Sequence, residues 1–267
     1  MIDIEQLILQ YFQNDFSCPY KLGCGYILNI NPIKVKDWSI FERSLGILEI
    51  DKNKINDFEI IQMSYLEFLC NKILSDKSCT QQLINIFNYA MNEDNIHLGK
   101  FNNKSVLIIC DKDDIKKGFI TSKEFDEISK IILFQNIKDY DDREVNEDVK
   151  ELMQEYYKIK YRDIKDPTLE EKKTYVIAKT GIKMSDINEM TYRTFSQVYK
   201  HSIDDVLYIG DKIIQGSEKY EMKKGQEVKH PLFEKPKDPY AEIFSNTSVL
   251  SEKGIKGAEQ LNMLDKE

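Results

Sequence analysis

The chain has 267 residues, of which 41% are hydrophobic and 31% are charged, and this balance is that of a globular protein rather than of a fibre or a wholly disordered chain. Its 46 acidic residues outnumber its 38 basic residues, so the formal net charge is -8. Phosphate backbones and anionic membrane surfaces repel a chain of this charge, which disfavours nucleic acid and membranes as partners.

The N-terminal segment MIDIEQLILQYF begins with acidic residues and lacks the basic start and apolar run of a secretory signal. No stretch of about 18 apolar residues occurs, so we expect no membrane span. The five cysteines lack the spacing of a disulfide framework. We therefore expect reduced thiols and a cytoplasmic location.

The first part of the chain, up to about residue 95, is predicted to form a small α+β unit. A helical apolar spacing predicts a helix over 3–12. The segment YKLGCGYILNI predicts a β-hairpin with a glycine turn, and Pro32 ends its second strand because proline has no N–H to donate. Asp37 is predicted to cap a helix over 38–48. Further apolar spacing predicts helices over about 58–75 and 80–91.

A second α+β element is predicted over residues 96–136. Residues 97–101 and 105–110 are expected to pair as a hairpin across Asn102 and Asn103. Thr121 and Glu124, three residues apart, have the pattern of a capping box and predict that a helix starts there. The segment DYDDREVNED that follows is too charged to bury, and it predicts a hinge or domain boundary.

Beyond the boundary the pattern is helical. We expect helices over about 146–161, 168–179, 186–200 and 203–215, joined by short connections as in a small bundle. After Gly216 prolines become frequent and apolar residues sparse, which predicts an extended or disordered tail. The expected fold class is therefore α+β and mostly helical. Its parts are an N-terminal domain (1–138) with a hairpin-plus-helix region, a helical bundle (146–215) and a tail (216–267).

No set of side chains is spaced for a known chemistry. A zinc site needs two close pairs of ligands, and Cys18 and Cys24 have no second pair. The acidic runs from Asp111 and Asp139 lack the Gly and Glu positions of a calcium-binding loop. The GCG turn completes neither a dinucleotide fingerprint nor a P-loop. We therefore expect no catalytic, metal-binding or cofactor-binding site; a nuclease built on acids and a lysine stays open as an alternative.

Two stretches resemble proteins of tailed bacteriophages. The first, YKLGCGYILNINPIKVKDWSIFERSLGIL, is similar to the compact domain that opens many tail and baseplate assembly chaperones. The second, GFITSKEFDEISKIILFQNIKDYDDREVNEDVKELMQE with TYVIAKTGIKMSDINEMTYRTFSQVYK, resembles uncharacterised tail-module proteins of phages that infect Gram-positive bacteria. The resemblance spans residues 18–215, and its motifs are structural, so it carries no site residues over.

The resemblance implies a non-enzymatic, chaperone-like assembly factor that binds other phage tail or baseplate proteins in the host cytoplasm and uses no cofactor. Isolated apolar residues of the tail are the expected partner-binding anchors. These anchors are Phe233, Tyr240, Phe244 and Leu250. One alternative is a structural virion component of the tail, baseplate or head–tail connector that clamps a neighbour with its C-terminal arm. A second is a small phage-encoded enzyme or host-defence antagonist.

Overall fold

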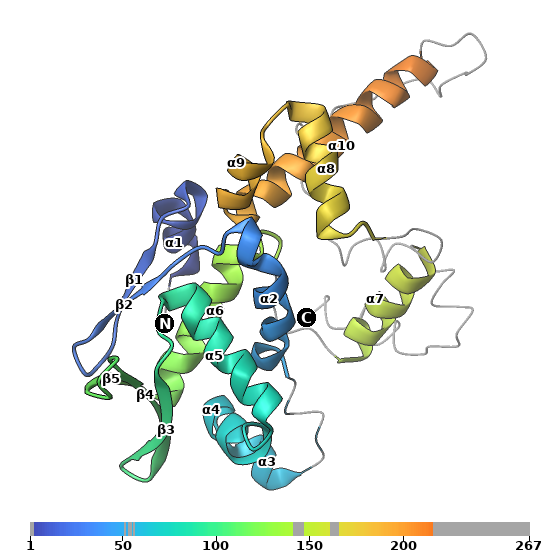
Figure 1. The fold of residues 1–267 in the computed structure, drawn as a ribbon. Helices are drawn as coiled ribbons and strands as arrows, with labels where there is room; N and C mark the ends of the chain where they lie inside the picture. The colour runs from blue at the N-terminus through green and yellow to red at the C-terminus, as the bar shows by residue number, and fades with distance from the viewer. Residues whose placement is uncertain are drawn as a thin grey trace. The chain divides into compact units, whose positions relative to one another are not determined.

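Two small antiparallel sheets and a larger set of helices build the chain in this computed structural model (Figure 1). The structure describes residues 3–50, 52, 55, 57–140, 147–160 and 166–215. The predicted α+β, mostly helical fold class is confirmed for this part of the chain. None of the helices described here combines the length and the apolar character that a membrane span requires.

The predicted N-terminal hairpin is confirmed. After helix α1 (Ile4–Gln10) and the 3-10 turn η1 (Phe12–Asn14), strand β1 (Cys18–Lys21) pairs with β2 (Ile27–Ile30). Gly25 has a φ of 92°, a backbone conformation that glycine adopts without steric cost. The turn is closed by a hydrogen bond of 2.8 Å from the Leu22 N–H to the Tyr26 carbonyl.

Helix α2 (Val35–Leu45) begins three residues earlier than predicted, and it is followed by a 3-10 turn, η2 (Gly46–Leu48). Its N-cap is Lys34, so the prediction that Asp37 caps this helix is wrong. The backbone before α2 is fixed instead by a tertiary contact, because the Val35 N–H donates to the Met190 carbonyl at 2.9 Å. Asp37 lies in the first turn, where its charge still favours the helix dipole.

The long helix predicted over 58–75 is broken into α3 (Phe58–Gln62), α4 (Tyr65–Phe68) and a π-helical turn, η4 (Leu69–Ile73). Ser64 and Glu67 form a capping box that starts α4, and the ammonium of Lys52 donates to carbonyls at the end of α3. These two side chains satisfy the backbone groups that a break exposes. Helix α5 (Lys77–Met91) follows, capped by Asp76.

The second sheet has three strands in the order β3-β4-β5. The predicted hairpin of β3 (Ile96–Phe101) and β4 (Lys104–Cys110) is confirmed, and Asn102 and Asn103 both take positive φ in its turn. The third strand, β5 (Lys116–Ile120), was not predicted from the sequence.

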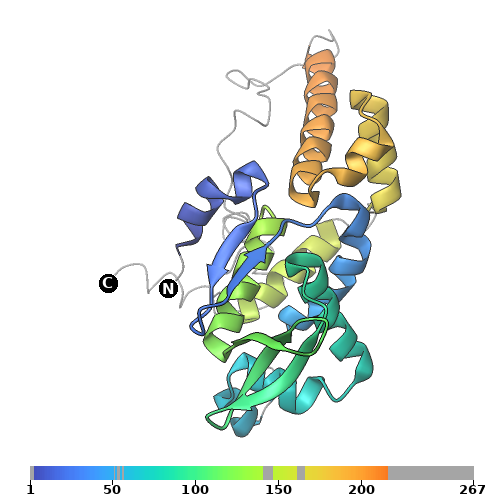
Figure 2. The same cartoon turned by 60° about the vertical axis from the view of Figure 1, so that its left-hand side comes forward.

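Helix α6 (Ser122–Asn136) begins with the predicted capping box of Thr121 and Glu124. Its two last residues, Gln135 and Asn136, are almost fully buried and hold the neighbouring chain. The Gln135 amide donates to the Ile30 carbonyl at 3.2 Å, and the Asn136 carbonyl oxygen accepts from the Ile33 N–H at 2.8 Å. Figure 2 shows the β1–β2 hairpin beside this helix. The segment between β2 and α2 is thereby fixed by buried hydrogen bonds.

The C-terminal half of the described chain contains α7 (Glu147–Lys160), α8 (Leu169–Thr180), α9 (Met184–Glu189) and α10 (Tyr192–Gln215). Helix α10 is continuous, so the predicted break between 200 and 203 is wrong. The break lies at Met190 and Thr191 instead, because Thr191 forms an isolated β-bridge with Lys34.

Two compact units divide the chain: Met1–Asp141 with Leu169–Ser202, and Asp142–Thr168 with Ile203–Glu267. This division differs from the predicted one, which placed 146–215 in a bundle of its own. In the first unit a small second core joins α2 to the helices that follow α7. It consists of Val35, Val176, Ile187 and Phe195. Burial of these side chains explains why α8, α9 and the start of α10 belong with the α+β part.

Candidate functional site

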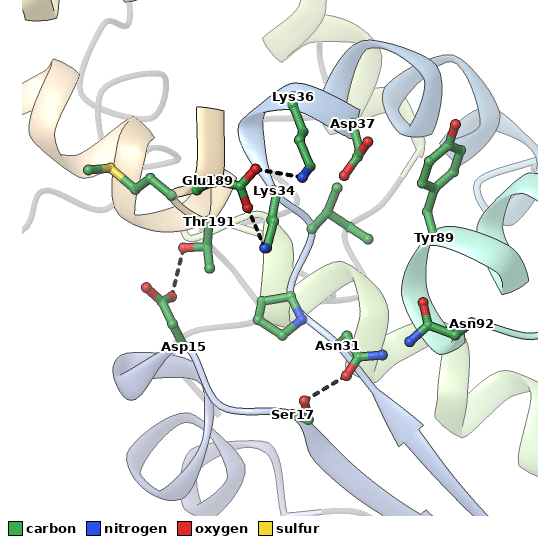
Figure 3. A pocket seen from close by; sticks show the side chains of 13 residues that line it. Asp15, Ser17, Asn31, Lys34, Lys36, Asp37, Tyr89, Asn92, Glu189 and Thr191 are labelled. Atoms are coloured by element: carbon green, nitrogen blue, oxygen red, sulfur yellow. Dashed lines mark hydrogen bonds and ion pairs between the residues drawn. The ribbon is translucent and has the colours of Figure 1, made fainter. Parts of the chain in front are cut away.

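A polar cleft of about 670 Å³ lies in the first unit, where the segment between β2 and α2 meets the turn between α9 and α10 (Figure 3). Most of its lining side chains are polar or charged. They include Asp15, Ser17, Asn31, Lys34, Lys36, Asp37, Tyr89, Asn92, Glu189 and Thr191. The cleft is the first candidate for a site, because small ligands bind in concave sites where polar groups converge.

The backbone on both sides of the cleft is held by the bridge between Lys34 and Thr191. The Tyr192 N–H donates to the Ile33 carbonyl at 2.7 Å, next to the bond between Val35 and Met190. The ring of Tyr192 stacks on Trp38, with the ring centroids 3.4 Å apart and nearly parallel planes. The start of α10 is therefore fixed to the start of α2 by backbone and side-chain contacts together.

Asp15 lies outside α10 and binds two side chains at the start of that helix. Its carboxylate accepts hydrogen bonds from the hydroxyls of Thr191 at 2.8 Å and Thr194 at 2.7 Å. Nearby, the buried Arg193 guanidinium donates to the Phe134 carbonyl at 2.8 Å. Burial lowers the pKa of Arg193, and the charges of Asp15 and Asp139 oppose that shift. Asp15 thus stabilises both the N-terminus of α10 and a buried cation.

The two lysines of the cleft share one carboxylate. Glu189 accepts from the ammonium groups of Lys34 and Lys36, each at 2.6 Å (Figure 3). These hydrogen bonds hold the pKa of Glu189 at about 2, and the bond to Glu189 raises the pKa of Lys36. The carboxylate of Glu189 therefore partly neutralises the two ammonium groups. These ion pairs connect the segment before α2 to the end of α9.

Two hydroxyls of the cleft donate hydrogen bonds to other side chains of its wall. The hydroxyls of Thr191 and Ser17 donate to Asp15 and Asn31, and neither bond joins a nucleophile to a base that a third group orients. Within the described ranges, no group of three or more His, Cys, Asp and Glu residues could hold a metal ion.

The second candidate is the C-terminal half of α10, in the other unit. It exposes five large apolar side chains, each with 41% to 69% of its surface accessible. They are Val206, Leu207, Ile209, Ile213 and Ile214, and we call them the α10 stripe. Their spacings of three, four and seven residues place them on one face of the helix.

Charged residues border this stripe on both sides. At 100° per residue, Asp204 and Asp211 follow one edge, next to Leu207 and Ile214. The opposite edge carries one acidic residue and Lys212, whose ammonium lies 5.6 Å from the centre of the Tyr208 ring. One edge of the stripe is therefore acidic and the other is mixed.

The same apolar face of α10 is covered nearer its start. Phe195 is 1% exposed, and Tyr192, Val198 and Tyr199 pack against the small second core. Single exposed apolar residues elsewhere, such as Phe58, are ordinary on a protein surface. A contiguous stripe of five on one helix is instead typical of a surface that binds another protein.

The four tail anchors predicted from the sequence, Phe233, Tyr240, Phe244 and Leu250, lie outside the described residues. The α10 stripe was not predicted from the sequence, because residues 203–215 were expected to form one helix of a small bundle. The signal was present in the apolar spacing, but spacing alone does not distinguish a face that packs inside the protein from one that packs on a partner.

Comparison with known protein families gave no match, and neither the curated proteins nor the solved structures gave one. The choice of function therefore depends on the residues and their geometry.

Proposed function

We propose that the chain is a non-enzymatic assembly factor for the tail or baseplate of a tailed bacteriophage, and that it binds a tail protein through the α10 stripe. The exposure of five large apolar side chains on one helix face carries this proposal. An amphipathic helix that lays its apolar face into a groove is a common way for one protein to recognise another.

The size of the stripe suits reversible binding. Full burial of a large aliphatic side chain contributes about 1.5–3 kcal/mol, and these five side chains are already partly covered. Covering the rest would contribute about 5 kcal/mol, and the loss of translational and rotational freedom on association offsets part of it, so the stripe alone supports weak binding. An assembly factor has to shield apolar surface of its client and then release it, and binding of this strength permits both.

The partner class is supported by the resemblance of residues 18–215 to tail-module proteins. The net charge of -8 supports a protein partner over a nucleic acid. The acidic surface also helps keep a complex with an apolar client in solution.

Gene deletion in the phage that encodes the chain tests this function. We expect the deletion to give filled heads without tails in electron micrographs, and the wild-type gene to restore tails. A gene carrying both Leu207→Asp and Ile213→Asp should fail to restore them, because two charges on the stripe prevent its burial. The matched control carries Phe58→Asp and Ile115→Asp, two exposed apolar positions off the stripe, and should restore tails.

Two results would contradict the proposal. Normal tails from the deletion phage would exclude an assembly function. A fixed number of copies of the chain in purified particles would identify a virion component instead of an assembly factor.

A further inference from the structure

We infer that one end of the β3-β4-β5 sheet binds a single-stranded nucleic acid, with Phe101 stacking on a base and Lys104 and Lys123 holding phosphates. This surface is separate from the α10 stripe, so the inference adds a second partner to the proposed function. It follows from an exposed aromatic ring and two lysines without ion pairs that line the same hollow.

The hollow has a volume of about 330 Å³ and lies where the β3–β4 turn meets the start of α6. Phe101, Lys104 and Lys123 line it, and none of its other lining residues is acidic. Sites for small ligands have volumes of about 300–1,000 Å³, so the hollow is large enough for one part of a longer ligand.

Both lysines of the hollow are available to an anion. They are exposed, and neither forms an ion pair with any residue that the structure describes. The carboxylate of Glu124, next to Lys123 in the sequence, accepts hydrogen bonds from the backbone N–H groups of Thr121 at 2.7 Å and Gly23 at 2.6 Å. The two ammonium groups can therefore pair with phosphate oxygens of a ligand.

Two phenylalanine rings extend the surface beyond the hollow. Lys104 and Ile108 are four residues apart on β4 and therefore share a face of the sheet. Their partners on the neighbouring strands, Phe101 and Phe119, lie on that same face, with ring centroids 4.8 Å apart. Phe101 is 48% exposed, and the ammonium of Lys116 lies 4.6 Å from the centre of the Phe119 ring. This face thus has an accessible ring and a third cation beside the hollow.

The local charge of this region differs in sign from that of the whole chain. Residues 96–123 contain six lysines and three aspartates and no other Arg, Asp or Glu, so their formal charge is +3, whereas the chain carries -8. Charges on a protein surface act over about 10 Å at 0.1 M salt. A ligand at this end of the sheet is therefore governed mainly by the nearby lysines.

A single strand matches both parts of this surface. Its phosphates can pair with the lysines, and its unpaired bases can stack on the exposed ring of Phe101. In a duplex the bases are stacked on one another, so the ring gains no partner. An acidic peptide matches the lysines but has no row of flat bases for the ring.

A fluorescein-labelled thymidine oligonucleotide of about ten residues tests the inference on the full chain by fluorescence anisotropy. We expect it to bind at low salt and to bind more weakly as salt is added. The pair Lys104→Glu and Lys123→Glu should weaken binding at least about tenfold and make it less dependent on salt, because two phosphate contacts are lost. Phe101→Ala should weaken binding about tenfold and leave the salt dependence unchanged, because it removes stacking alone.

Matched variants separate the site from general effects of charge and exposure. The pair Lys179→Glu and Lys183→Glu changes the net charge by the same amount at exposed positions in and after α8, and it should keep nearly the wild-type affinity. Phe58→Ala removes an exposed ring outside the sheet and should also bind as the wild type does. Circular dichroism confirms that each variant retains its secondary structure.

Several outcomes would overturn the inference. Absence of binding at low salt would reject the site, and equal weakening by the two charge-reversal pairs would show an effect of overall charge alone. Equal competition by a duplex of the same length, by thymidine monophosphate or by a glutamate peptide would assign the hollow to that class of ligand instead. None of these results bears on the phage complementation, which tests the proposed function separately.

Discussion

Replacing Phe195 with alanine tests whether α8, α9 and the start of α10 fold together with the α+β part of their unit. Phe195 is 1% exposed and belongs to a core of only four buried residues. The only tryptophan of the chain, Trp38, stacks on Tyr192 at the same junction. Its fluorescence therefore reports on the contact between α2 and α10 without any label.

The expected loss follows from the volume removed. A buried Phe→Ala change costs about 3–5 kcal/mol, because it removes apolar contacts and leaves a cavity. With a denaturant dependence of roughly 2 kcal/mol per molar of urea, the midpoint of unfolding should fall by about 2 M.

Urea unfolding is followed by Trp38 fluorescence and by far-ultraviolet circular dichroism. If the first unit folds as one, the Trp38 transition and the main dichroism transition should coincide and move together in the variant. The control Leu207→Ala changes a side chain that is 58% exposed, and it should change the free energy of unfolding by less than about 0.5 kcal/mol. An unchanged Trp38 midpoint with a separate, earlier loss of helix signal would refute this reasoning and restore a separate bundle.

Three further predictions concern the cleft and the thiols. Asp15→Ala should lower the free energy of unfolding by about 2 kcal/mol in urea titrations, because it removes the acceptor of two hydroxyl hydrogen bonds. Asp15→Asn keeps one acceptor oxygen and should lose less; equal losses from the two variants would contradict the role of these hydrogen bonds. The folded-state pKa of Glu189, about 2, lies below its ordinary value of 4.5, so its ion pairs stabilise the fold above pH 4.5 and are lost as the pH falls towards 2. The difference in midpoint between wild type and Glu189→Gln should therefore narrow over that range, and a constant difference would contradict the assignment. Burial raises the pKa of Cys18 to about 11, whereas Cys24 is exposed, so mass spectrometry after iodoacetamide treatment at pH 8 should find Cys24 alkylated first; equal rates would contradict the burial of Cys18.

Features coded by a few neighbouring residues were predictable from the sequence. The hairpin across Asn102 and Asn103 needs two residues that tolerate positive φ, and both asparagines adopt it. The capping box of Thr121 and Glu124 satisfies backbone donors within a single turn. Such features depend on local chemistry, and the rest of the fold leaves them unchanged.

Features that depend on distant contacts were not predictable in this way. The break before α10 is set by a bridge between Lys34 and Thr191, which are far apart in the sequence. The break before α4 is satisfied in part by Lys52, whose ammonium reaches across to the end of α3. Strand β5 lacks a strong alternation of apolar residues, and it forms because β4 offers an edge to pair with.

The candidate site was predictable only in its parts. The spacing of apolar residues in 203–215 predicted the helix, which the structure confirms as the last part of α10. Its exposure depends on which other segments cover it, and a periodic pattern carries no such information. The cleft is likewise a product of tertiary contacts, since Asp15, Lys34 and Glu189 come from three separate segments.

Photo-crosslinking during phage infection tests the central claim most directly. A photoreactive phenylalanine analogue is placed at Leu207 on the α10 stripe or, as a control, at Phe58, and crosslinked products are identified by mass spectrometry. The proposal predicts that the analogue at 207 crosslinks to one tail or baseplate protein and that the analogue at 58 does not. Crosslinks from both positions to the same mixture of proteins, or none from position 207 to a tail protein, would contradict it.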